Sequence, residues 1–148
     1  MSEIGIHKKG EVDLSSLLAR LRSGLSKDVG AIGCFVGVIR GASDEGKAVK
    51  YLHYETAEDA LAKLEKIASD IEQLPKIKKV MIHHIVDQIA PGEDAIYVLL
   101  AGVRRSEVFK ALSEIMDRVK REVPVWKKEI AEGKEQWGHE IGSIDKQT

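Results

Sequence analysis

The sequence predicts a protein that combines helices and strands, of the α/β or α+β class. Segments with apolar residues at helical spacing alternate along the chain with short apolar runs rich in β-branched and aromatic residues. At 148 residues the chain has the length of one domain and can bury a core without disulfides or metals. We therefore expect a single domain over residues 1–148, with residues 143–148 as a loose tail.

In the first half of the chain we expect two helices and three strands. Residues 2–7 could form an edge strand, and Asp13 is a suitable N-cap for a helix that carries four leucines between positions 14 and 21. Ala31–Ile39 is mostly apolar and predicts a buried strand, in which Gly33 and Gly37 serve close packing or a bulge. A strand over 48–55 and a helix with apolar residues from 57 to 71 follow.

In the second half we expect two strands, over 79–89 and 95–103, and then a helix that Pro124 ends near Val123. His83 and His84 are adjacent in the first of these strands. Their side chains must point to opposite faces, so they cannot hold one ion together, and we expect no metal and no cofactor.

The composition excludes several classes of protein. The formal net charge is −1, so there is no overall basic excess for nucleic acid, and no apolar run reaches the ~18 residues of a membrane helix. The single cysteine, Cys34, excludes an internal disulfide framework and a multi-cysteine zinc site. We expect a buried structural thiol there, and a reducing, cytoplasmic setting.

Three arginines are candidates for binding an anion. Arg104 and Arg105 come between a strand and a helix, where free amides and the positive end of the helix dipole already favour a phosphate. Arg40 ends a predicted buried strand, where a guanidinium can bind a phosphate or carboxylate through two hydrogen bonds. In each case an ordinary solvated or structural arginine is the alternative interpretation.

The helix before Pro124 is predicted to carry a lysine at the edge of an apolar stripe. At 100° per residue, Arg105, Phe109, Leu112, Met116 and Lys120 fall within roughly an 80° arc. Lys120 either extends its ammonium to water or is a partly buried amine suited to proton transfer or nucleophilic work. In a straight helix Arg105 and Lys120 lie about 22 Å apart, so one small ligand could not contact both unless the chain bends or another subunit contributes.

The chain resembles the large, catalytic subunit of molybdopterin synthase. The most specific match is the run with Lys120, Pro124, Trp126, Lys127 and Glu129. Three shorter matches precede it in the family's order, at Phe35–Arg40, Leu52–Glu55 and Arg105–Phe109. Because four motifs occur in the right order between Ala31 and Trp137, chance resemblance is a poor explanation.

The resemblance implies an α+β fold of the α/β-hammerhead type, with a mixed or antiparallel sheet and packed helices. It also implies sulfur transfer from the C-terminal Gly-Gly thiocarboxylate of a small ubiquitin-like subunit to cyclic pyranopterin monophosphate, which forms the dithiolene of molybdopterin. The expected assembly is a homodimer within a heterotetramer, without nucleic acid or membrane. This is an enzymatic role in molybdenum cofactor biosynthesis.

The resemblance also assigns expected roles to residues. Lys120 and Lys127 would be catalytic, either stabilising negative charge or relaying protons. The substrate would be bound by six further residues, of which the arginines would hold its phosphate: Arg40, Arg104, Arg105, Phe35, Met116 and Glu129.

Three positions depart from the family pattern. His84 stands where the family usually has an arginine. Arg104 stands where the family has a histidine, so a proton-transfer role there is in doubt because arginine stays charged. The arginine that follows the late tryptophan in related chains is absent after Trp137. The alternative is therefore a catalytically impaired member that binds anions or a ubiquitin-like partner as a scaffold.

Overall fold

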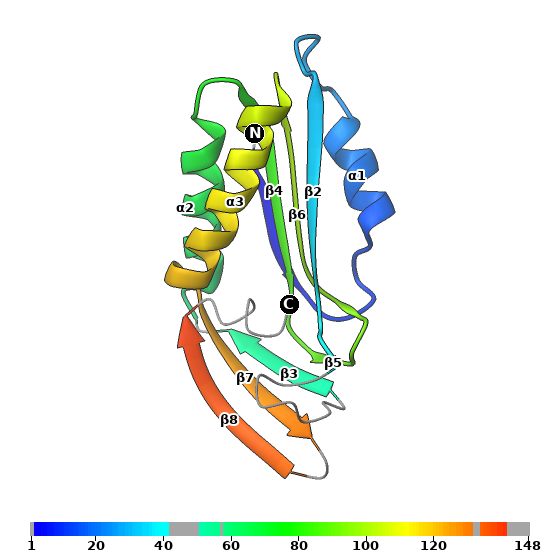
Figure 1. The fold of residues 1–148 in the computed structure, drawn as a ribbon, viewed down its shortest axis with the longest axis vertical. Coiled ribbons are helices and arrows are strands. Elements are labelled where there is room, and N and C mark those ends of the chain that lie inside the picture. The colour runs from blue at the N-terminus through cyan, green and yellow to red at the C-terminus, as the bar shows by residue number, and fades with distance from the viewer. Residues whose placement is uncertain (1, 42–50, 57, 132–133, 142–148) are drawn as a thin grey trace.

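Two four-stranded sheets organise the chain, and three helices pack on the larger one (Figure 1). The computed structural model describes residues 2–41, 51–56, 58–131 and 134–141, and side chains within 2–41 and 58–123. The larger sheet has the order β1 (Glu3–His7), β4 (Ile77–Ile85), β6 (Asp94–Gly102), β2 (Ala31–Val38). The smaller has the order β5 (Gln88–Ile89), β3 (Tyr51–Thr56), β7 (Pro124–Ala131), β8 (Lys134–Ile141). The helices are α1 (Leu14–Arg22), α2 (Ala60–Glu72) and α3 (Arg105–Glu122).

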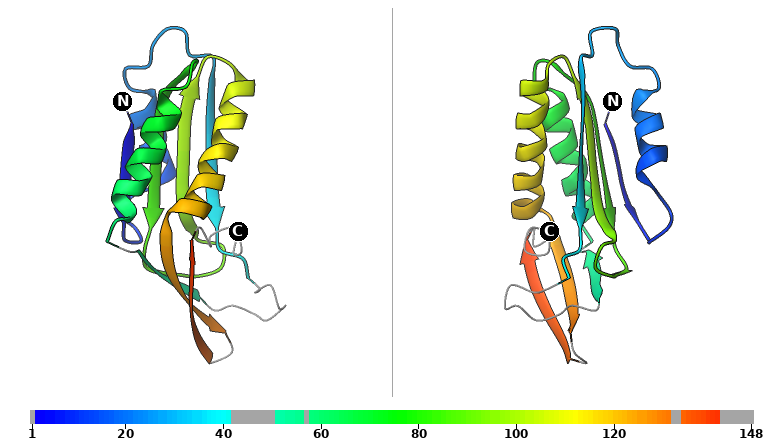
Figure 2. Two further views of the ribbon diagram at one scale, coloured as in Figure 1. Left: turned by 90° about the vertical axis from the view of Figure 1, so that its left-hand side faces the viewer. Right: turned by 45° about the vertical axis from the view of Figure 1, so that its right-hand side comes forward.

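The larger sheet is mixed and covered on both faces. β1 runs parallel to β4, whereas β4 with β6 and β6 with β2 are antiparallel. α2 and α3 lie on one face, and α1 lies on the other (Figures 1 and 2). Because the central strands β4 and β6 meet helices on both sides, nearly all of their residues are buried. The predicted α+β class is confirmed.

Glycine allows α3 to approach β2 closely. A Cβ atom at Gly33 would lie 2.5 Å from Val108 Cγ1 and 2.8 Å from Leu112 Cδ1, closer than carbon atoms can pack. The register of β2 against β6 also shifts between Gly37 and Val38, as a bulge requires. Both expected uses of the strand glycines are confirmed.

Several local predictions are correct. Asp13 is the N-cap of α1 and accepts a 2.9 Å hydrogen bond from the backbone N–H of Ser16. α3 begins at Arg105 with Arg104 as its N-cap, and its C-cap Val123 is extended, directly before Pro124. Val123 is the residue that proline restricts, which explains why the helix ends there. Along the part of the chain that is described, no helix is long and apolar enough to cross a membrane.

Three predictions about burial and strand length are wrong. β2 is an edge strand that α1 does not cover, so Cys34 is exposed and is not a buried thiol. The strand expected over 79–89 divides into β4 and β5, which belong to different sheets. The buried face of α3 is rotated from the expected stripe, and Phe109 is 67% exposed. The residues that are buried instead are Val108, Ala111, Ile115, Met116 and Val119.

A network of polar side chains links β1 to β4 and α1. His83, 2% exposed, lies 2.7 Å from Glu3 Oε2 through Nε2 and 2.8 Å from His7 Nε2 through Nδ1. Arg20 of α1 forms a 2.7 Å ion pair with Glu3. His84, the next residue of β4, points to the opposite face of the sheet, toward α2 and α3, and therefore takes no part in these contacts.

Burial of His84 predicts a loss of stability in acid. Desolvation lowers its pKa from 6.5 to about 4, so the unfolded chain binds a proton that the folded chain does not. The stabilisation is complete above pH 6.5 and is lost as the pH falls toward 4, by about 2 to 3 kcal/mol at pH 4.5. Urea unfolding of wild type and His84→Leu at pH 7.5 and 4.5 measures this effect.

The His84→Leu comparison isolates one group, because the carboxylates titrate alike in both proteins. We expect the wild type to lose more stability than the variant between the two pH values. Equal losses would show that protonation of His84 does not contribute.

Candidate functional site

The N-terminal end of α3 forms a basic pocket. Arg104 and Arg105 are both exposed, and the Arg104 side chain makes no capping hydrogen bond to the helix. A cavity of about 440 Å³ opens there, lined by Gly30, Val103, Arg104, Arg105 and Ser106. The first amides of α3 have no partners within the helix and can donate to a ligand. The two guanidinium groups and the positive end of the helix dipole both favour a negatively charged ligand here. These features keep the N-terminal end of α3 as a candidate anion-binding site.

One carboxylate lies near this pocket. Glu107 is in the first turn of α3, 3.9 Å from Lys76 Nζ. The hydrogen bond from Ser106 lowers the pKa of Glu107, and the positive charges of Lys76 and Arg104 act in the same direction. Glu107 is therefore ionised at neutral pH, but one carboxylate among three cations leaves the region positive.

The other predicted residues lie at the opposite end of α3. β2 and α3 both run toward the lower end of the molecule in Figure 1, where Arg40 follows β2 and Lys120 lies in the last turn of α3. Both side chains are exposed, whereas Met116, one turn before Lys120, is only 8% exposed. The exposed position of Lys120 fits the interpretation in which its ammonium extends to water, and it does not fit that of a partly buried amine.

Phe35 and Met116 lie at the same level of the β2–α3 interface. Gly33 faces Leu112, and Phe35 is on the same face of β2 because side chains alternate along a strand. Two strand residues advance about 6.6 Å and four helical residues about 6 Å. The step from Gly33 to Phe35 therefore matches the step from Leu112 to Met116. The next helical step reaches Lys120.

Lys127 and Glu129 belong to β7. Lys127 is paired with Tyr54 of β3 and Gly138 of β8, and Glu129 is paired with Leu52 and Gln136. Positions two apart in a regular strand lie on the same face, and residues 127 and 129 are both paired within β7. The side chains of both residues lie outside the described part of the structure.

A single chain does not bring all the predicted residues together. Arg104 and Arg105 are at one end of α3, and Arg40, Met116 and Lys120 are at the other. Since α3 is continuous from Arg105 to Glu122, Arg105 and Lys120 are separated by about four turns, or about 22 Å along the helix axis. The chain does not bend to bring them together, which leaves a second subunit as the remaining solution.

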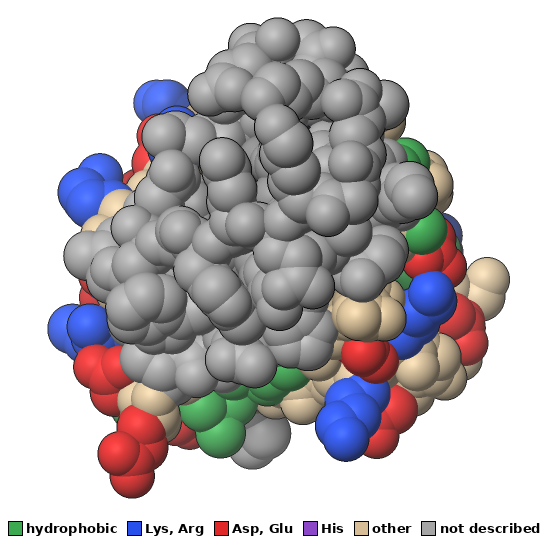
Figure 3. Space-filling view, turned by 90° about the horizontal axis from the view of Figure 1, so that it is seen from below, with side chains coloured by type: hydrophobic (Ala, Val, Ile, Leu, Met, Phe, Trp, Pro, Cys, Tyr) green, Lys and Arg blue, Asp and Glu red, His purple; other side chains and the backbone are tan. Residues whose placement is uncertain are grey.

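Around the described rim of the lower end, seen from below, basic and acidic side chains are interspersed, with hydrophobic side chains between them (Figure 3). Among the residues that the structure describes, no group of three or more His, Cys, Asp or Glu side chains could hold a metal ion.

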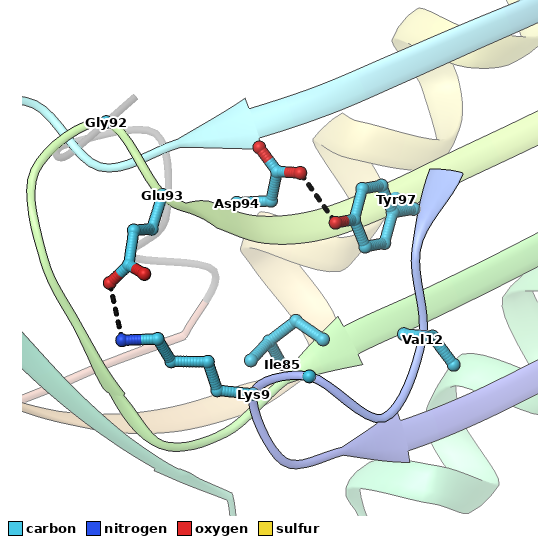
Figure 4. Close-up of a pocket in the computed structure, with 8 residues that line it drawn as sticks. Lys9, Val12, Ile85, Gly92, Glu93, Asp94 and Tyr97 are labelled. Atoms are coloured by element: carbon cyan, nitrogen blue, oxygen red, sulfur yellow. Dashed lines mark hydrogen bonds and ion pairs between the residues drawn. The ribbon is translucent and has the colours of Figure 1, made fainter. Parts of the chain in front are cut away.

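A second cavity, which the sequence did not predict, lies on the α1 face of the larger sheet. It measures about 290 Å³ and lies between the turns at Gly10 and Gly92 (Figure 4). Lys9 and Glu93 form a 2.7 Å ion pair at its rim, and Tyr97 donates a 2.6 Å hydrogen bond to Asp94. Burial raises the pKa of Tyr97, so its hydroxyl stays protonated. The charged groups pair with each other, which gives this cavity a structural role in joining the two turns.

The structure defines an α+β protein with candidate anion-binding residues at the two ends of one helix. Comparison with protein families identifies it further, because residues 7–122 match the model described as MoaE protein. The chain belongs to the MoaE protein family.

Known relatives agree with this assignment. The chain is 34% identical over 115 residues to the molybdopterin synthase catalytic subunit of Pyrococcus abyssi, covering 76% of each protein. It is 37% identical over 106 residues to the protein of that description from Drosophila pseudoobscura pseudoobscura, covering 70% of this chain. The match spans only 29% of the length of the fly protein.

A solved structure extends the likeness to nearly the whole chain. The molybdopterin biosynthesis MoaE protein from Burkholderia ambifaria superposes with a TM-score of 0.79 at 31% identity. The match covers 95% of this chain and 91% of that one. The family predicted from the four sequence motifs is confirmed.

Proposed function

We propose that this chain is the catalytic subunit of a molybdopterin synthase. In this reaction, sulfur passes from the C-terminal thiocarboxylate of a small ubiquitin-like subunit to cyclic pyranopterin monophosphate, and two such transfers make the dithiolene. The match of residues 7–122 to the MoaE protein family is the observation that carries the proposal. The location of Arg104 and Arg105 at a helix N-terminus supports it, because the substrate is a phosphorylated pterin.

The substrate and the sulfur donor are both anions, which matches the basic residues at the two ends of α3. Arg105, with Arg104 and Arg40, would hold the phosphate through charge-assisted hydrogen bonds. Lys120 and Lys127 would stabilise the negative charge on the thiocarboxylate and on the oxygen of the tetrahedral intermediate formed from it, or relay protons there. Phe35 and Met116 would form the apolar wall of the pocket, and Glu129 would orient Lys127.

A twofold dimer would unite the two ends of α3. β2 is one of the two edge strands of the larger sheet, and Val38 of β2 and Phe109 of α3, the helix packed on β2, are 37% and 67% exposed. If two copies met along this edge with antiparallel strands, the upper end of one chain would lie beside the lower end of the other. Arg104 and Arg105 of one copy would then complete the site that contains Lys120 of its partner.

The complete enzyme would be a heterotetramer of this dimer with two small subunits. We also propose a cytoplasmic location, which a chain with one exposed cysteine supports because the cytoplasm keeps thiols reduced.

A scaffold role is the second candidate, and the replacement of the family histidine by Arg104 favours it. Arginine can bind an anion but cannot exchange protons at neutral pH. Such a chain would bind the pterin or the small subunit without turnover.

Product formation tests the two candidates. The purified chain is mixed with cyclic pyranopterin monophosphate and a small subunit carrying a C-terminal thiocarboxylate, and molybdopterin is measured. A matched small subunit with an ordinary carboxylate is the control. We expect product only with the thiocarboxylate. Complex formation without product would reject the synthase and support the scaffold.

A further inference from the structure

The junction between α3 and β7 determines where two proposed catalytic lysines lie. Lys120 precedes the junction by two residues and Lys127 follows Pro124, the first residue of β7, by three. Val119 and Val123 are both 1% exposed, and the backbone N–H of Val123 donates a 3.1 Å hydrogen bond to the carbonyl of Val119. The inner side of the junction is therefore packed in the core.

A guanidinium fixes the outer side of the same junction. Arg118 donates to both carboxylate oxygens of Glu122, the last residue of α3, at 2.7 and 3.0 Å. Its remaining terminal nitrogen donates to Asp70 of α2 at 2.9 Å. The Arg118 side chain is only 15% exposed, so it lies between the two helices. Three hydrogen bonds from one planar group set the position of the helix end relative to α2.

The charges of this cluster are present across the neutral range. Hydrogen bonds from Arg118 are the largest cause of the lowered pKa of both Asp70 and Glu122, and the carboxylate of Glu122 raises the pKa of Arg118. One planar guanidinium bonded to two carboxylates at three points fixes the geometry of the helix end, because the fork of its N–H groups matches the carboxylates only in one orientation.

We propose that Arg118 is a positioning residue that aligns Lys120 and Lys127 by tying the end of α3 to α2. The inference rests on the proposed synthase function. Arg118 contacts neither lysine in the described structure, and acts through Glu122 at the point where the helix becomes β7. A displacement of about 1 Å at a reacting group can reduce a rate by roughly 100-fold, so a loosened junction has a large kinetic consequence.

Kinetic constants of five variants test the proposal. Arg118→Met removes all three hydrogen bonds, Asp70→Asn weakens only the link to α2 by removing its negative charge, and the third variant combines both. Lys66→Met is the matched control, because Lys66 is the other partner of Asp70, at 3.3 Å, and is 71% exposed. Circular dichroism at the assay temperature shows the folded fraction. For each folded protein, kcat and the KM for the pterin are then measured.

We expect Arg118→Met to lower kcat by roughly 10- to 100-fold with an almost unchanged KM for the pterin, since the arginines that hold its phosphate are intact. Adding Asp70→Asn to Arg118→Met should cost nothing more, because the shared contact is already lost. Arg118→Lys should have a kcat between those of Arg118→Met and the wild type. Its ammonium can still pair with a carboxylate, but it cannot make the three fixed contacts of a guanidinium. Lys66→Met should retain the wild-type kcat.

Other results would overturn the proposal. An Arg118→Met protein that is folded and turns over at the wild-type rate would show that the junction needs no such link. An equal loss in Lys66→Met would assign the effect to the charge of α2. Wild-type protein that makes no product would instead refute the proposed synthase function, and with it the positioning role given to Arg118.

Discussion

Lys120→Ala is expected to reduce molybdopterin formation by at least about 100-fold. Lys120 is exposed in the last turn of α3, one turn beyond the buried Met116, and it is the proposed group that meets negative charge developing at the thiocarboxylate. Removing one donor that stabilises such charge typically costs 100- to 1,000-fold in kcat. The measurement is single-turnover product formation with saturating small subunit, so that weaker binding is not mistaken for slower chemistry.

Lys110→Ala is the matched control, because Lys110 is an exposed lysine on the same helix, away from both proposed groups of site residues. It should keep wild-type turnover. A Lys120→Ala protein with normal kcat but weakened small-subunit affinity would move Lys120 from the chemistry to the docking surface. Equal losses in both variants would indicate a general effect of charge on α3.

Local sequence signals predicted the ends of α3 and the residues at each end. Proline chemistry fixed the C-terminus at Val123, and the strand-to-helix transition identified Arg105 as the start. These predictions depend on a few neighbouring residues, and the tertiary structure does not change them. The proposed roles of Lys120, Lys127 and Glu129 came from the family motif, and they remain predictions.

The errors concern properties that depend on which strands become neighbours. Cys34 was expected to be buried in the apolar strand Ala31–Ile39, but its strand is an edge strand, and a run of apolar residues cannot distinguish edge from centre. Phe109 was assigned to the apolar stripe of α3 from its helical spacing, which does not tell how far the neighbouring strands extend beside the helix. Cys34 lies on the edge strand β2, and Phe109 lies on the helix packed against it. Apolar side chains that stay exposed in one chain indicate where a second chain could pack.

Arg105→Ala and Lys120→Ala are each expected to be nearly inactive alone and to restore activity when mixed. In the proposed dimer, each site takes Lys120 from one chain and Arg105 from the other, because the two residues are about four helical turns apart within a chain. A mixed dimer therefore has one site with both residues intact and one with neither. Random exchange of subunits gives half mixed dimers, so about a quarter of wild-type activity should return.

The experiment requires the two variants to be unfolded and refolded together, or co-expressed with different tags, so that subunits exchange. Each variant refolded with itself is the control. Activity that stays at the level of the separate variants, despite mixed dimers isolated by both tags, would show that Arg105 and Lys120 do not share a site across the interface. In that case the pocket at the N-terminus of α3 and the lysine at its C-terminus would bind separate anions. A return to about a quarter would establish that the site of this α+β fold is completed only by its second copy.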